Sequence, residues 1–138
     1  MVNKQKIEYN YTQEERRVIF MIDSKSFYAS VECVERNYNP LKALLVVMSE
    51  QENTNGGLVL ASSPMAKKIL GITNVTRQRD IPVCPDLVIA HPRMNLYIQE
   101  NLRINNIYRQ YTDDAHLLPY SIDAVSYTHL RAHETGAY

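Results

Sequence analysis

The sequence predicts a mixed fold of the α/β or α+β class, in which short strands and helices alternate along 138 residues. Short apolar runs rich in β-branched residues indicate the strands, and stretches with apolar residues at helical spacing indicate the helices. Hydrophobic residues make up 45% of the chain and charged residues 22%, values that exclude a disordered or collagen-like protein. The length suits one ordinary domain.

The first predicted elements are a strand and a helix. Residues 18–23 (VIFMID) are five apolar residues and an acid, which is typical of a strand buried on both faces. A helix is predicted over residues 24–37. Its apolar face is marked by three residues at helical spacing, Phe27, Val31 and Val34.

The middle of the chain predicts a β-hairpin and a short helix. Residues 43–49 and 57–63 are apolar strands separated by a turn-rich connection. The helix begins at Pro64, since proline suits the first helical position, and ends before Gly71, since glycine commonly follows a helix.

The last third predicts a strand, a long helix and a strand. Residues 86–90 form a short apolar strand, and residues 93–111 carry the longest helical pattern. Most tyrosines of this helix lie on its apolar stripe, so they are expected in the core. Residues 117–123 (LLPYSID) form a final strand that ends in an acid, as the first strand does.

Two acids, Asp23 and Asp123, end these two strands and form the candidate metal-binding pair. An acid at the end of a buried strand lies where a sheet opens to ligands. Converging carboxylates can hold two divalent cations about 4 Å apart for phosphoryl transfer, and Mg²⁺ prefers such oxygen ligands. The alternative is that each aspartate only caps the turn or helix that follows it.

A locally basic segment lies within the chain, whose 15 Lys and Arg balance its 15 Asp and Glu. The zero net charge argues against a strongly basic nucleic-acid module. Residues 53–79 nevertheless contain no acid and four bases: Lys67, Lys68, Arg77 and Arg79. They are candidates for phosphate contacts. A solvated helix face and loop is the alternative.

An aromatic pair follows Asp23 closely. Adjacent helical residues point about 100° apart, so Phe27 can join the core while Tyr28 faces the candidate site. A ring beside a metal-bound nucleotide could bar a 2′-hydroxyl by steric contact. Simple packing of both rings is the alternative.

Three stretches together resemble the Y-family, or UmuC-like, translesion DNA polymerases of Gram-positive bacteria and their mobile elements. They are MIDSKSFYASVE (residues 21–32), ASSPMAKKILGITNVTR (residues 61–77) and YSID (residues 120–123) after the long helix. Their order and separation match the family over residues 18–123.

The resemblance implies a particular form of the α+β class. Part of a right-hand palm, a mixed or antiparallel sheet with helices, would comprise residues 18–26 and 93–124. A small fingers subdomain would comprise residues 27–92, and residues 1–17 would be a polar leader.

The resemblance also implies a metal site. Asp23 and Asp123 would be catalytic, metal-binding carboxylates, and Ser24 would offer its backbone carbonyl to one of two Mg²⁺ ions.

A nucleotide site is implied beside the metals. Tyr28 would be the steric gate that rejects ribonucleotides, with Phe27 next to it. Lys67 falls where the family places a basic residue on the triphosphate, and Lys68 and Arg77 are further candidates for the same contact.

The resemblance breaks after Asp123. The family pattern continues with Glu, but this chain has Ala124, and residues 125–138 (VSYTHLRAHETGAY) resemble no polymerase. They read as a translated transposon-type sequencing adapter joined to an interrupted gene. At such a junction the adapter would supply the last two bases of codon 124, CT, so a native first base G gives an alanine codon. Glutamate codons also begin with G. We therefore expect a native Glu at position 124 and a non-native tail after it.

The resulting functional prediction is the N-terminal part of a cytoplasmic, error-prone polymerase of the SOS response that adds dNTPs to a primer on damaged template. Primer–template DNA and a dNTP are the implied partners, with a sliding clamp and RecA as candidates for a full-length protein and no membrane. The 138-residue chain itself is expected to be inactive. The alternatives are a non-catalytic nucleotide- or DNA-binding module, and an unrelated metal-dependent nuclease or cyclase.

Overall fold

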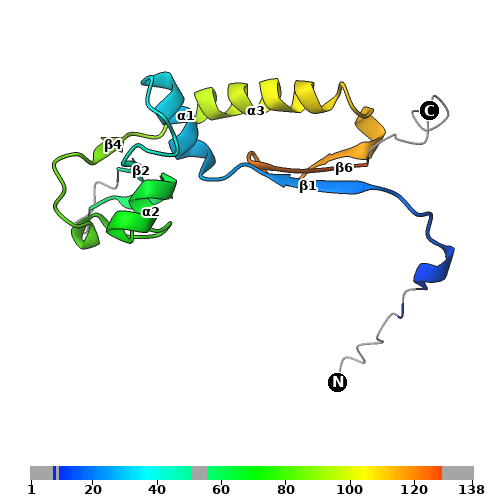
Figure 1. Ribbon diagram of the computed structural model, residues 1–138, viewed down its shortest axis with the longest axis horizontal. Coiled ribbons are helices and arrows are strands. Elements are labelled where there is room, and N and C mark those ends of the chain that lie inside the picture. The colour runs from blue at the N-terminus through cyan, green and yellow to red at the C-terminus, as the bar shows by residue number, and fades with distance from the viewer. Residues whose placement is uncertain (1–7, 9, 51–55, 129–138) are drawn as a thin grey trace.

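Two small sheets make up the fold in the computed structural model, which describes residues 8, 10–50 and 56–128 (Figure 1). The first sheet has β2 (Leu45–Ser49) at its centre. β3 (Leu58–Ser62) pairs antiparallel with β2, as the hairpin prediction requires, and β4 (Val88–Ala90) pairs parallel with β2 on the other side. This pairing confirms the predicted hairpin and the α+β class.

A helix covers each face of the first sheet. Alternate residues of β2 point to opposite faces, so the strand is buried on both sides, as its continuous apolar sequence favours. On one face Leu45 and Val47 pack with α1 (Phe27–Glu35). On the other face Val46 and Met48 pack with α2 (Pro64–Leu70).

The ends of α2 confirm the prediction made from its sequence. Ser63 caps the helix, because its Oγ accepts a hydrogen bond from the N–H of Ala66 at 3.2 Å. Gly71 ends it with φ of 64°, a left-handed conformation that glycine adopts without strain.

The second sheet has the order β1-β6-β5, with antiparallel pairing throughout. Its strands are β1 (Ile19–Asp23), β5 (Leu117–Pro119) and β6 (Ala124–Thr128). The long helix α3 (Met94–Tyr108) runs along this sheet (Figure 1). Among the described residues, the other regular elements are the 3₁₀ turns Tyr11–Gln13, Gln78–Asp80 and Asp114–His116.

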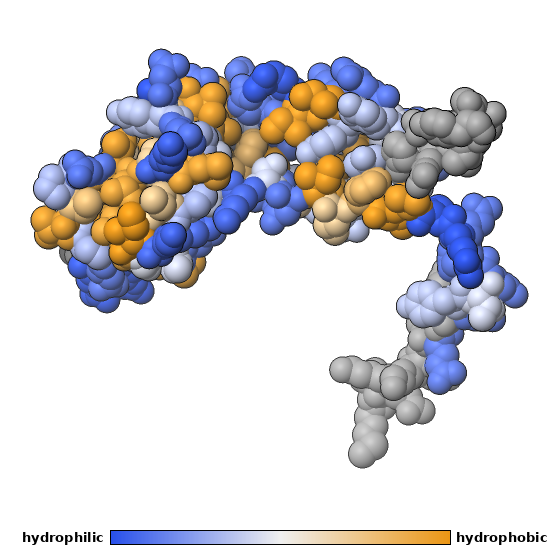
Figure 2. Space-filling view, viewed as in Figure 1, coloured by the Kyte–Doolittle hydropathy of each residue, from blue (hydrophilic) through white to orange (hydrophobic). Residues whose placement is uncertain are grey.

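The prediction that the first strand is buried on both faces is wrong. Ile19 is 61% exposed and Met21 63% exposed, because they alternate with Phe20, which faces α3 through Tyr127, and no described element covers the opposite face of the sheet. Figure 2 shows apolar surface over the β1–β6 part of the molecule as well as over the part that contains α2.

Two predicted helix faces are also partly wrong. Val34 on α1 is 60% exposed, because α1 is buried where it meets the first sheet and Val34 points away from that contact. Of the tyrosines predicted in the core, Tyr97 on α3 is fully buried, but Tyr111, which follows α3, is 56% exposed. The narrow three-stranded sheet beneath α3 covers only part of the helix surface.

The final predicted strand is interrupted. β5 ends at Pro119 and β6 begins at Ala124, so Asp123 lies in the connecting turn and not at the end of a strand. The N–H groups of Tyr120 and Ser121 both donate to the carbonyl of Ala124, at 2.9 and 3.2 Å, which closes this turn.

Several predicted segments lie partly outside the described residues. These are residues 1–7 and 9 of the leader, residues 51–55 of the hairpin connection, and residues 129–138 of the predicted foreign tail. Residues 125–128 lie in β6, at the centre of the second sheet. The foreign origin of residues 125–138 and the palm and fingers boundaries stay predictions. Across the described ranges, no helix is long and apolar enough to cross a membrane.

Candidate active site

A pocket of about 470 Å³ lies between the two sheets, where β1 leads into α1. Its wall combines the turn after β1, the start of α1, part of β3 and side chains from α2 and from Asp123. In Figure 2 the surface at the junction of the two parts is mainly hydrophilic. The pocket therefore collects polar groups from segments that are far apart in the sequence.

The two predicted carboxylates lie together in this pocket. Asp23 is the last residue of β1 and pairs in register with Ala124, so Asp123 is directly adjacent. The N–H of Ser24 donates to the backbone carbonyl of Asp123 at 2.7 Å, and the Ser121 hydroxyl donates to Asp123 Oδ1 at 2.5 Å. Antiparallel pairing therefore places both acids at the same end of the sheet.

The donors at this end of the sheet suit a hard cation. Two carboxylates and the backbone carbonyl of Ser24 are the oxygen ligands that Mg²⁺ prefers, and the ion commonly leaves positions for water and substrate oxygens. Within the described part of the chain, no group of three or more acids, histidines or cysteines could hold a metal. Ala124 follows Asp123 directly, at the position where the family resemblance implies a glutamate.

The aromatic pair divides between core and pocket. Phe27 is 6% exposed and packs with Val31 and Tyr97, although its edge also reaches the pocket. Tyr28 is half-buried on the pocket wall. Both rings come from the first turn of α1.

The predicted bases do not all meet at the pocket. Lys67 lines it from α2, together with Lys25 from the turn after β1. Lys68 and Arg77 are exposed and lie outside its lining. Their predicted phosphate contacts stay predictions, whereas Lys67 is placed where such a contact is possible.

The start of α1 adds further polar groups. Ser26, which precedes the helix, has a left-handed φ of 51°, and no side chain caps the first turn. Its hydroxyl is buried on the pocket wall and has no hydrogen-bond partner among the described residues. Uncapped N–H groups at a helix start favour an anion.

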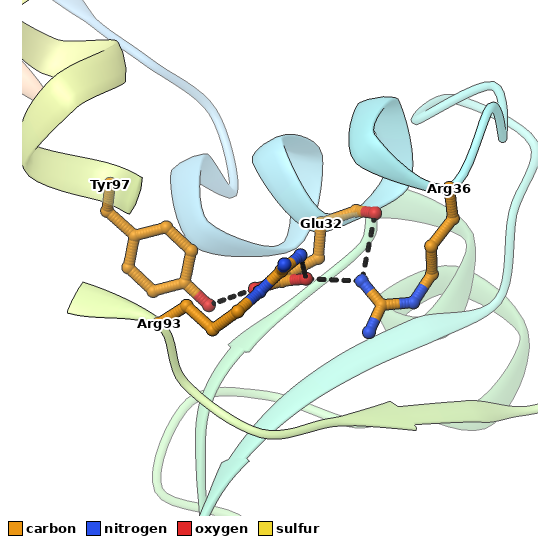
Figure 3. A network of polar contacts seen from close by, with 4 residues as sticks. All are labelled: Glu32, Arg36, Arg93 and Tyr97. Carbon is orange, nitrogen blue, oxygen red and sulfur yellow. Dashed lines mark hydrogen bonds and ion pairs between the residues drawn. The ribbon is translucent and has the colours of Figure 1, made fainter. Parts of the chain in front are cut away.

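A buried charge cluster beside the pocket was missed by the sequence interpretation (Figure 3). Glu32 on α1 is fully buried and accepts hydrogen bonds from Arg93 at 3.0 and 2.5 Å, from Arg36, and from the Tyr97 hydroxyl at 2.7 Å. Burial alone would raise the pKa of Glu32, but the bonds from Arg93, Arg36 and Tyr97 lower that pKa to about 2. Glu32 is therefore a buried group that stays ionised at neutral pH.

The cluster also changes Tyr97. Burial, together with the neighbouring Glu32 carboxylate, raises the pKa of the Tyr97 hydroxyl to about 12, so it stays a donor. One sequence signal could have pointed to the cluster, since Glu32 and Arg36 are four residues apart on a predicted helix.

Comparisons with known proteins agree with this geometry. A sequence profile of the impB/mucB/samB family matches residues 22–135. The chain belongs to this family. The family match spans both carboxylates, the aromatic pair and the whole pocket.

Relatives of the chain include two proteins of Bacillus subtilis (strain 168). The DNA repair protein homolog YozK is 37% identical over 114 residues, which cover 83% of this chain and 98% of YozK. DNA polymerase IV 2 is 43% identical over 108 residues, which cover 78% of this chain and 25% of that protein. The chain thus spans nearly all of one relative and about a quarter of the other.

A solved structure supports the fold. A Y-family DNA polymerase chimera superposes with a TM-score of 0.72 at 22% sequence identity, covering 86% of this chain and 33% of the chimera. The impB/mucB/samB chain therefore has the fold of a Y-family polymerase over about a third of such a protein.

Proposed function

We propose that this chain carries the metal- and nucleotide-binding residues of a translesion DNA polymerase. Such an enzyme adds dNTPs to a primer on damaged template DNA in the cytoplasm. One observation carries the proposal: a single pocket collects Asp23, Asp123, Tyr28 and Lys67 in a chain of the impB/mucB/samB family. A site for a nucleoside triphosphate requires carboxylates that bind its metal ions, a basic side chain that contacts its phosphates and a ring that packs against its sugar.

The proposed mechanism assigns one task to each wall of the pocket. Asp23, Asp123 and the Ser24 carbonyl would hold Mg²⁺, with two ions in an active enzyme. Bound Mg²⁺ would favour the deprotonated primer 3′-hydroxyl and neutralise the charge that develops on the phosphates. Lys67 and the uncapped start of α1 would orient the triphosphate.

The ring of Tyr28 would set the choice of sugar. It lies on the same pocket wall as the start of α1, so a nucleotide whose phosphates meet that helix would bring its sugar close to the ring. A 2′-hydroxyl would then clash with the ring, whereas a deoxyribose would fit.

The 138-residue chain is proposed to bind a dNTP without extending a primer. Only two carboxylates of the described chain face the pocket, and Ala124 stands where the family resemblance implies Glu. Loss of one carboxylate weakens the hold on divalent cations, because each ligand supplies both charge and geometry. The substitution Ala124→Glu is expected to raise Mg²⁺ affinity.

Calorimetric titration of the chain with dATP, with and without Mg²⁺, tests the proposal. Mg²⁺-dependent binding that Asp23→Ala abolishes is the expected result, and Arg103→Ala on the exposed side of α3 is the control. The second measurement is a primer-extension assay, in which we expect the unsubstituted chain to add no nucleotide. Binding of dATP that is indifferent to both Mg²⁺ and Asp23→Ala would contradict the proposal.

Titration of the same variants with primer–template DNA examines a second candidate function, a non-catalytic nucleotide- or DNA-binding module. The observation that favours it is Ala124, which leaves the pocket with two acids. This function predicts DNA affinity that survives Asp23→Ala and does not depend on Mg²⁺.

A further inference from the structure

We infer that Glu32 is a positioning residue for Tyr28: through Tyr97, it fixes the ring that separates deoxyribonucleotides from ribonucleotides. The inference rests on the proposed function for the identity of the nucleotide. Glu32 does not line the pocket, and it lies one helical turn beyond Tyr28 on α1. Its effect on the pocket must therefore pass through another side chain.

Tyr97 supplies the physical connection. Its hydroxyl donates to Glu32 Oε1 at 2.7 Å, and its ring stacks on Tyr28 with centroids 4.6 Å apart and planes 14° apart. The other ring beside Tyr28 is Phe27, which lies 6.0 Å away and is tilted by 55°. Tyr97 is thus the stacked neighbour of Tyr28 within the described structure, and the two ring planes constrain each other.

The hydroxyl bond adds a restraint that apolar packing lacks. A packed ring can tilt within its cavity at small cost, whereas a hydrogen bond to a fixed oxygen depends on direction as well as distance. Tyr97 is fully buried, so water cannot replace Glu32 as the acceptor. The tilt of Tyr97, and with it the plane of Tyr28, is set by the position of Glu32.

The arginines keep Glu32 in that position. Arg93, which directly precedes α3, donates to both carboxylate oxygens, and Arg36 reaches one of them from α1 (Figure 3). Moving a fully buried carboxylate away from these partners would leave an uncompensated charge. The same contacts hold α3 against α1, so the Tyr97–Tyr28 stack is fixed from both helices.

Two conservative variants test the inference. Glu32→Gln keeps the volume and removes the charge, and Tyr97→Phe keeps the stacked ring and removes the hydroxyl. The matched control is Glu100→Gln, which removes a carboxylate that pairs with Arg103 on α3 and lies outside the pocket lining. Circular dichroism establishes folding, and Tyr97→Phe keeps the test decisive if Glu32→Gln does not fold.

The measurement is the ratio of the dissociation constants for ATP and dATP in the presence of Mg²⁺. We expect this discrimination to fall about fivefold in both variants, the equivalent of one hydrogen bond, with dATP affinity and the control nearly unchanged. If Glu32 and the Tyr97 hydroxyl had a merely structural role, the variants would lose affinity for ATP and dATP equally. Unchanged discrimination in folded Tyr97→Phe, or an equal loss for both nucleotides, would overturn the inference.

A second readout separates failure of the inference from failure of the proposed function. The ring protons of Tyr28, assigned with Tyr28→Phe, should show the ring-current shift of a stacked neighbour in the original chain and lose part of it in both variants. If the original chain bound neither nucleotide, the proposed function would fall, and an unchanged Tyr28 shift in the variants would overturn the positioning role independently.

Discussion

The two sheets differ sharply in how well they are covered, and the pocket takes groups from both. In the β3-β2-β4 sheet, Leu45, Val46 and Val47 have no exposed surface, because α1 and α2 cover opposite faces. In the β1-β6-β5 sheet, Ile19 and Met21 are more than half exposed. The carboxylates thus lie on the poorly covered sheet, and Lys67 and Tyr28 lie on helices of the well-covered one.

This difference separates stability from metal chemistry. A buried strand fixes the backbone that carries the basic and aromatic wall, whereas the carboxylates depend on the pairing of β1 with β6 and on the turn before Ala124. Exposed sheet surface with few apolar contacts opens more readily. The acidic half of the pocket is therefore expected to be its less stable half.

The largest expected effect compares the same substitution in each sheet. Leu45→Ala should lower the free energy of unfolding by about 2–5 kcal/mol, because it leaves a cavity in a fully buried site. Leu118→Ala on β5, where the side chain is 55% exposed, should change it by less than about 0.5 kcal/mol. Urea unfolding followed by circular dichroism measures both. Equal losses would show that the second sheet is covered in solution.

The next effect concerns the charge cluster that joins α1 of the first sheet to α3 of the second. Because the pKa of Glu32 lies at about 2 in the folded chain and at its ordinary 4.5 when unfolded, ionised Glu32 stabilises the fold at pH values above 4.5. That contribution, roughly 3 kcal/mol, is lost as the pH falls from about 5 towards 2.

Urea unfolding at pH 6 and pH 3 measures this loss. The original chain should lose most of the contribution, and Glu32→Gln should lose much less over the same interval, since it has no carboxyl to protonate. Tyr97→Phe removes one hydrogen-bond donor to Glu32, so this variant should lose stability at a higher pH than the unsubstituted chain does. A pH dependence identical in the original chain and Glu32→Gln would contradict the role of this carboxylate.

How much could be predicted from the sequence follows the same division. The hairpin and α2 were predicted correctly, because their signals are local: two apolar strands around a turn, Ser63 before the helix and Gly71 after it. The adjacency of Asp23 and Asp123 required knowledge of how β1 and β6 pair. The predicted burial of residues 18–23 failed because coverage is a tertiary property that an apolar run does not encode.

The charge cluster marks the limit of prediction from sequence most clearly. Arg36 lies one turn from Glu32 and could be inferred as its partner, but Arg93 is 61 residues away. No local pattern connects these positions, and a glutamate among apolar helix residues resembles an ordinary exposed acid. Only packing of α3 against α1 turns it into a buried, ionised group.

The smallest expected effect tests whether the well-covered sheet contributes to the pocket through one side chain. Lys67 and Lys68 are adjacent on α2, yet only Lys67 lines the pocket. Lys67→Ala should weaken dATP binding about fivefold, roughly 1 kcal/mol, because it removes one charged contact to phosphate. Lys68→Ala should leave the affinity within about twofold, since an exposed lysine outside the pocket contributes only a screened, long-range attraction.

Titration at low and moderate salt separates the two contributions, because the Lys67 contact persists as salt rises. Equal losses that vanish together with salt would mean that α2 attracts the triphosphate only by its general charge and that Lys67 makes no specific phosphate contact.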